Sequence, residues 1–291
     1  MGGGTWTRDA FTSYTASTKA YASVSLDGTI TGISDNAQDV FKSRGIAAEL
    51  KPMNVMRECL DTAEHPNTIP VILALDVTGS MGGAAVEVAK KLNVIMTSLY
   101  EKVKDVEFLV MGIGDLAYDN APIQASQFES DIRIAEQLDK IFFEGGGGGN
   151  AYESYTAAWY FGVNHTKLDC WKRNKKGIII TMGDEPLNPY LPYMPLHNVT
   201  GDSLQADINT KDLYEQVIQK YDVYHLVVND TRTAFRYKDR IHASFGEYLD
   251  GQHLIEVTLD SLANTIVDIV TNASDSCMTT TEINSNGEIS W

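Results

Sequence analysis

The chain has 291 residues, 43% of them hydrophobic, which is enough apolar material for one large α/β domain with additions or for two small domains. Its formal net charge of −16 argues against nucleic acid or an anionic membrane as the main partner, because both would repel it. Cys59, Cys170 and Cys277 lie far apart without CxxC spacing, so we expect neither a zinc cluster nor a disulfide framework. No signal-like run and no apolar stretch of roughly 20 residues is present, so we expect a soluble, cytoplasmic protein.

Residues 1–66 precede the strongest core pattern, and we expect them to form an N-terminal arm with a small β/α extension. The first 20 residues are rich in Gly, Ser and Thr, which favours a loose arm or a segment ordered by docking. The alternation on either side of Asp27-Gly28 predicts a hairpin. A short helix is expected around residues 53–62.

A repeat of strand, loop and helix begins with the apolar run VILAL at residues 71–75. The next segment predicts a helix, because its apolar residues are three or four positions apart: Ala85, Val88, Leu92, Ile95 and Leu99. Further strands are expected at 106–113, 177–181, 223–228 and 253–257, and further helices near 130–142, 151–164, 205–220 and 261–272. This alternation predicts an α/β domain over residues 67–273, with a doubly wound, mainly parallel sheet and helices on both faces. A polar tail, residues 274–291, follows it.

The loop after the first of these strands carries the clearest chemical signal. In DVTGS, residues 76–80, a carboxylate and two hydroxyls alternate at the carboxyl end of a strand, where parallel sheets bind ligands. Oxygen donors of this kind suit Mg²⁺ or Mn²⁺, and a site with few carboxylates leaves room for water ligands. Alternatively, Thr78 or Ser80 could simply cap the helix that follows.

The sequence DVTGSM after an apolar strand resembles the motif that opens the metal-ion-dependent adhesion site of von Willebrand factor A (vWA) domains. The glycine run 145–149 with Asn150 resembles the family's second loop, and Asp184 after IIIT resembles its third. The resemblance extends over about residues 70–272, and it is greatest to stand-alone intracellular members from bacteria and phages. It implies a Rossmann-like fold.

This resemblance also implies roles for the four best-matched residues. Thr78 and Ser80 would bind the ion directly, while Asp76 and Asp184 would hold its water molecules. One coordination position would stay open for a carboxylate of a protein partner. In intracellular relatives that partner is often an AAA+ ATPase, and other such relatives belong to phage-conflict systems.

Two positions depart from the family pattern. The usual threonine of the second loop is absent, so Asn150, Glu153 or Ser154 could supply that ligand; we expect Asn150, with Glu153 behind it. Asp184 stands about one residue beyond the common position, where Met182 would align. Methionine does not serve a hard cation, so we assign the third loop to Asp184.

Three functions fit these residues. The preferred one is a metal-dependent protein-interaction module without enzymatic activity, because no nucleophile–base motif is present. A phosphatase-like hydrolase using Asp76 is less favoured, because it would want a second carboxylate where Thr78 stands. The third is a structural subunit of a larger assembly, docked through residues 1–66. The proline-rich segment 186–195 fits either a partner platform at the metal rim or a loop folded over the sheet edge.

Overall fold

A computed structural model describes residues 4–19, 22–146, 149–150 and 152–282. Gly147, Gly148 and the end of the expected tail, residues 283–291, lie outside the described residues, as does the side chain of Cys277. In the part of the chain that the structure describes, no helix combines the length and the apolar character needed to cross a bilayer. Cys59 and Cys170 are buried free thiols.

The centre of the fold is a six-stranded sheet in the order β12-β11-β8-β4-β5-β6, which makes the protein a mixed α/β structure. Neighbouring strands are parallel except β6, which pairs with β5 in the antiparallel direction. Five of these strands are the predicted ones, and the edge strand β6 was not predicted. The strands are β4 (Ile69–Asp76), β5 (Val106–Ile113), β6 (Ile123–Ala125), β8 (Gly177–Gly183), β11 (Tyr221–Val228) and β12 (Leu254–Val257).

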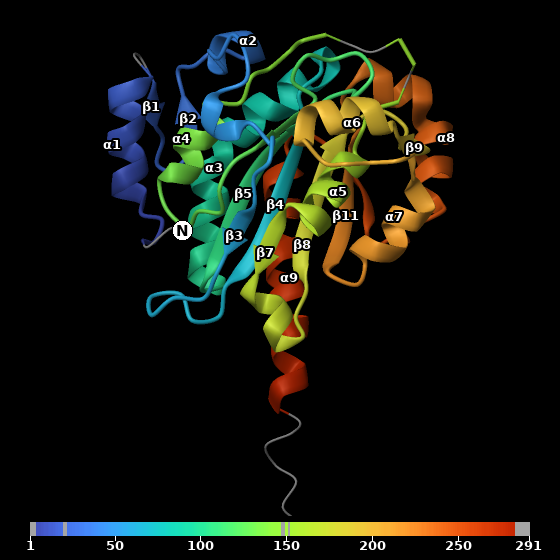
Figure 1. Ribbon diagram of the computed structural model, residues 1–291. Helices are drawn as coiled ribbons and strands as arrows, with labels where there is room; N and C mark the ends of the chain where they lie inside the picture. The colour runs from blue at the N-terminus through green and yellow to red at the C-terminus, as the bar shows by residue number, and fades with distance from the viewer. Residues whose placement is uncertain (1–3, 20–21, 147–148, 151, 283–291) are drawn as a thin grey trace, which may run out of the picture.

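The helices of the described chain lie around this sheet, with α1 and α8 at opposite sides of the view in Figure 1. They are α1 (Arg8–Thr18), α2 (Ala37–Val40), α3 (Gly82–Lys102), α4 (Arg133–Leu138), α5 (Thr156–Asn164), α6 (Tyr193–Thr200), α7 (Thr210–Val217), α8 (Arg232–Gly246) and α9 (Leu262–Glu282). The four predicted after α3 correspond to α4, α5, α7 and α9. Helix α9 continues beyond residue 273, where we expected the tail to begin.

Alternate residues of β4 enter two different hydrophobic clusters. Val71 and Leu73 belong to a cluster that includes buried residues of α3 and α9. Ile72 and Ala74 belong to a second cluster, which includes residues of α5 and α7 such as Trp159. A strand whose side chains are buried in both directions has no polar positions, which explains the continuous apolar run in the sequence.

The N-terminal segment docks on α3. The Trp6 indole donates a hydrogen bond to Asn93 Oδ1 (3.0 Å), and Phe11 is 1% exposed within the same cluster as the α3 side chains. Strands β1 (Ser23–Val24) and β2 (Ile30–Thr31) form the predicted hairpin, with Gly28 at φ +93° in its turn. Residues 8–18 form a helix with Phe11 and Thr15 buried, which agrees with the second alternative, a segment ordered by docking.

One prediction in this part of the chain was wrong. The helix expected around residues 53–62 is replaced by β3 (Arg57–Cys59), which pairs in parallel with β7 (Thr166–Leu168). That pairing was invisible in sequence because the partner lies more than 100 residues away. Residues 186–195 include β9 (Tyr190–Leu191), paired with β10 (Ile208–Asn209), and the first turn of α6, and their role as a partner platform stays a prediction.

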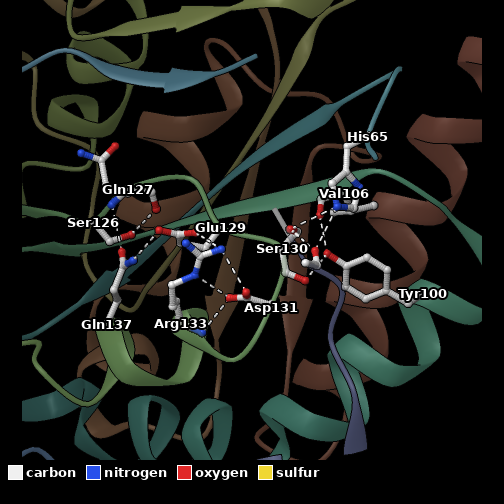
Figure 2. Close-up of polar contacts among 11 residues, drawn as sticks. His65, Tyr100, Val106, Ser126, Gln127, Glu129, Ser130, Asp131, Arg133 and Gln137 are labelled. Carbon is white, nitrogen blue, oxygen red and sulfur yellow. Dashed lines mark hydrogen bonds and ion pairs between the residues drawn. The ribbon is translucent and has the colours of Figure 1, made fainter. Parts of the chain in front are cut away.

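A polar cluster at the amino end of β5 fastens the N-terminal segment (Figure 2). The two ring nitrogens of His65 lie 3.1 Å from Asp105 Oδ1 and 2.9 Å from the Gly4 carbonyl oxygen. The Ser130 hydroxyl lies 3.5 Å from His65 Nε2, but it donates to the same Gly4 carbonyl at 2.6 Å and is completely buried. The contacts among Ser130, His65 and Asp105 therefore fasten the N-terminal segment, and the buried Ser130 hydroxyl is not exposed as a nucleophile would be.

Glu107 lies beside this cluster, 2% exposed, and its Oε2 has no hydrogen-bond partner among the described residues. Burial raises the pKa of Glu107 from 4.5 to about 7, although Cys59 and His65 act in the opposite direction. An acid whose pKa is higher in the folded state stabilises the fold at low pH and loses that contribution as the pH rises through about 7.

We predict that Glu107→Gln makes the protein less sensitive to rising pH, because the amide keeps the shape of the side chain without its charge. Between pH 5 and pH 9 the free energy of unfolding of the wild type should fall by about 2–3 kcal/mol more than that of the variant. Urea denaturation across this range measures the difference. Glu101→Gln, at an exposed position, should follow the wild type, and parallel curves for all three proteins would contradict the prediction.

Candidate metal centre at the carboxyl ends of the strands

The first and third predicted loops lie side by side at the top of the sheet in Figure 1. Strand β4 ends at Asp76, and its neighbour β8 ends at Gly183, directly before Asp184. The two strands are paired in parallel up to Leu75 opposite Met182, so the residues that follow them leave the sheet together. Met182 is buried in the core, which agrees with the assignment of the third loop to Asp184.

Two hydroxyl–carboxylate pairs form where these loops meet. Thr78 donates from its backbone N–H and its hydroxyl to Asp76 Oδ1, at 2.9 and 2.5 Å. The Ser80 hydroxyl donates to Asp184 Oδ1 at 3.0 Å, which joins the first loop to the third. Both carboxylates are at most 1% exposed, whereas Ser80 is exposed. The structure therefore brings together four of the five residues expected to bind the ion.

These hydroxyls do not cap the next helix. Thr78 precedes the 3-10 turn η2 (Gly79–Met81) and Met81 precedes α3, and neither position has a side-chain capping hydrogen bond. The alternative that the DVTGS loop is only a helix cap is therefore wrong, because the oxygens that would cap the helix face carboxylates instead.

The glycine run reaches the first loop through its backbone. Gly79 N–H donates to the Gly146 carbonyl at 2.8 Å, and Gly145 N–H donates to the Val77 carbonyl at 3.4 Å. A Cβ on Gly79 would lie 2.9 Å from the Gly145 carbonyl oxygen, closer than a side-chain carbon tolerates. Glycine is thus needed for the two loops to approach.

Asn150, the expected second-loop ligand, is exposed. Its Oδ1 accepts a hydrogen bond from Tyr152 N–H at 3.3 Å, and among the described residues no contact joins it to Asp76, Ser80 or Asp184. The Asn150 side chain also hydrogen-bonds to Asp115, where it acts against the rise in pKa that burial causes. The role of Asn150 as a ligand stays a prediction.

The two alternatives in that loop are placed differently. Ser154 Oγ accepts a hydrogen bond from Leu116 N–H at 3.0 Å, which occupies it in a structural contact. Glu153 is 1% exposed, and its Oε2 has no partner among the described residues. Burial raises the pKa of Glu153 to about 11, with a further contribution from the charge of Asp76. Of the three candidates, Glu153 is the buried one whose pKa is raised by the charge of Asp76.

Tyr155 completes the site, although no motif in the sequence points to it. Its hydroxyl donates to Asp76 Oδ2 at 2.8 Å and accepts a hydrogen bond from Glu185 N–H at 3.3 Å. Its ring packs on His225 and Phe245, with centroids 4.9 and 5.8 Å away. A Cβ on Gly183 would lie 1.9 Å from the Tyr155 hydroxyl, so glycine at that position makes room for the tyrosine.

Negative charge is concentrated around these residues. Burial raises the pKa of Asp76 to about 7, and the nearby charge of Asp184 adds to that effect. Burial also raises the pKa of Asp184, and it raises that of Glu185 to about 7 with help from Asp184. Burying several carboxylates costs folding free energy unless protons or a cation neutralise them.

The residues present fit a hard divalent cation. The donor set consists of hydroxyl and carboxylate oxygens, and buried oxygens of Asp184 (Oδ2) and Glu153 (Oε2) lack a hydrogen-bond donor among the described residues. In that same part of the chain, no group of three His, Cys, Asp or Glu side chains is arranged to hold a metal ion. A cation here would therefore depend on the hydroxyls and on water, as Mg²⁺ commonly does.

Comparison with known proteins gives likenesses of structure only. No protein-family model and no curated protein matches the chain. The pilus adhesin SpaC from Lactobacillus rhamnosus GG is 13% identical with a TM-score of 0.48; the match covers 78% of this chain and 31% of the adhesin. Proximal thread matrix protein 1 from the mussel byssus is 12% identical, with a TM-score of 0.44 and coverages of 71% and 48%.

The vWF domain of the type V pili tip protein Mfa5 from Porphyromonas gingivalis is also 12% identical, with a TM-score of 0.44; coverage is 77% of this chain and 98% of that domain. The chain thus spans about a third of the length of the pilus adhesin. With TM-scores below 0.5, these likenesses decide neither family nor function.

We predict that Tyr155→Phe destabilises the protein by about 1–3 kcal/mol, because it leaves Asp76 Oδ2 and the Glu185 N–H without their buried partner. Chemical denaturation in the presence of a chelator measures this loss apart from any metal. Tyr214→Phe is the matched control, since within the described chain the Tyr214 hydroxyl makes no hydrogen bond. Equal stabilities for the two variants would show that the Tyr155 hydroxyl does not support the site.

Proposed function

We propose that residues 67–273 form a vWA-like domain, doubly wound with helices on both faces of the sheet, that binds Mg²⁺ or Mn²⁺ and a protein partner. Thr78 and Ser80 would bind the ion directly, and Asp76 and Asp184 would hold its water molecules. The hydrogen bond between Ser80 and Asp184 carries the proposal, because it joins the ends of two neighbouring strands through the groups that the resemblance names. The two hydrophobic clusters support the doubly wound arrangement.

The exposed side of the site supports binding to a partner. Ser80 borders a pocket of about 340 Å³ that is also lined by Thr231, Arg232 and Leu259. When bound, the ion would supply a positive charge and a coordination position for a carboxylate of the partner. Asp184 would orient the site from below, because it is buried and bonded to Ser80. An AAA+ ATPase is the class of partner that the resemblance implies.

An interaction module fits this geometry better than a hydrolase. Asp76 would have to act as the nucleophile of a phosphatase-like reaction. Such a reaction would want a second carboxylate two residues further on, and Thr78, which donates to Asp76 Oδ1, stands in that place. We therefore propose binding without catalysis. The intracellular location expected from the sequence stays a prediction.

We predict that Ser80→Ala and Asp184→Asn each weaken Mn²⁺ or Mg²⁺ binding by at least about tenfold, which is typical of losing a ligand or the group that orients it. Isothermal titration calorimetry on the full chain measures the change. Ser80 is exposed, so its substitution tests the site without disturbing the core.

Ser17→Ala, at an exposed position on α1, is the matched control and should bind the ion like the wild type. Circular dichroism of each variant separates loss of binding from loss of folding. Unchanged affinity in folded Ser80→Ala and Asp184→Asn proteins would remove the metal site from the proposal.

A further inference from the structure

Helix α8 is basic in a strongly acidic protein. It carries four cationic residues and one acidic residue, Asp239, whereas the whole chain has a net charge of −16. Three of the cations share one face of the helix, because they are spaced by four residues: Arg232, Arg236 and Arg240. The buried residues Ala234, Ile241 and Phe245 lie on the opposite face, against the domain. We call the three exposed arginines the arginine stripe.

Two arginines of the stripe lie against tyrosine rings, and no carboxylate of the described chain neutralises the three by an ion pair. The Arg236 and Arg240 guanidinium groups each lie 5.2 Å from the centroid of the Tyr237 ring, and Arg240 also lies 5.1 Å from that of Tyr152. Within the described chain, none of the three arginines forms an ion pair, whereas Lys238 on the same helix pairs with Glu256 at 3.0 Å. The arginines are therefore exposed and available to a partner.

The stripe is continuous with the candidate metal centre. Arg232 and Ser80 line the same pocket. At the other end, Arg240 lies close enough to Glu185 to act against the rise in its pKa, which is due mainly to burial. The Ser244 hydroxyl accepts a hydrogen bond from Leu187 N–H at 3.0 Å, which fastens α8 to the loop after β8.

We propose that the arginine stripe is a docking surface for an acidic segment of the partner protein. This inference rests on the proposed function, in which one carboxylate of that segment reaches the metal centre while its neighbours contact the arginines. The stripe is about 12 Å long, which an extended segment of about four residues spans. Phe235, 87% exposed on the same helix, offers an apolar contact beside the charges. The overall negative charge of the protein disfavours nucleic acid as the occupant.

A fluorescein-labelled peptide of ten glutamates tests this proposal, with binding measured by fluorescence anisotropy on the full chain in Mg²⁺. The double variant Arg236→Gln/Arg240→Gln should bind the peptide about fivefold more weakly, as expected for the loss of two exposed ion pairs. Lys102→Gln/Lys104→Gln is the control with the same change in charge, at the end of the sheet remote from the metal centre, and should bind like the wild type.

Equal weakening in the two double variants would overturn the proposal, because it would reflect net charge alone. So would absence of peptide binding to the wild type, or tighter and arginine-dependent binding of a ten-nucleotide thymidine oligomer. Calorimetry with Mg²⁺ keeps the two proposals apart. Metal binding without peptide binding rejects the stripe and leaves the metal centre, whereas peptide binding that depends on the arginines without metal binding rejects the metal centre alone.

Discussion

Parallel pairing of β4 with β8 is the constraint on which the rest of the site depends. The pairing fixes Leu75 opposite Met182, so that Asp76 and Asp184 leave the sheet at neighbouring positions, although 107 residues separate them in the chain. Each then meets a hydroxyl from one short loop, Thr78 or Ser80. A shift of one residue in this register would move Asp184 away from Ser80 and put Gly183 or Glu185 in its place.

Holding carboxylates together inside a protein requires support from their surroundings. Tyr155 supplies a hydrogen bond to Asp76 from beneath, and Gly183 leaves the space that its ring needs. Gly145 and Gly146 contact the first loop through backbone hydrogen bonds. These neighbours keep the acidic groups in one arrangement, so a cation or a partner would meet a site that is already formed and would not have to organise it.

The sequence predicted the parts of this structure that depend on local pattern. Continuous apolar runs such as VILAL marked buried strands, and the spacing of apolar residues marked α3, because burial imposes these periods directly. The alternation of hydroxyls and carboxylate at residues 76–80 similarly revealed the first loop. The sequence could not predict contacts between distant segments. These are the pairing of β3 with β7, the hydrogen bond from Ser130 to the Gly4 carbonyl, and the hydrogen bond from Tyr155 to Asp76.

Helix α8 shows a different kind of omission, since its pattern was present in the sequence but not recognised. Thr231 caps it by accepting a hydrogen bond from Ala234 N–H, and its buried residues recur at helical spacing. Its many charged residues hid that period, yet the charges follow the period too, because arginine every fourth residue also defines a face. One pattern thus determines both faces of the helix. The apolar face packs beside the loop after β8, and the basic face is therefore directed outward, with Arg232 next to Ser80. In a protein with a net charge of −16, a basic face so placed would attract an acidic partner toward the site where its carboxylate could bind.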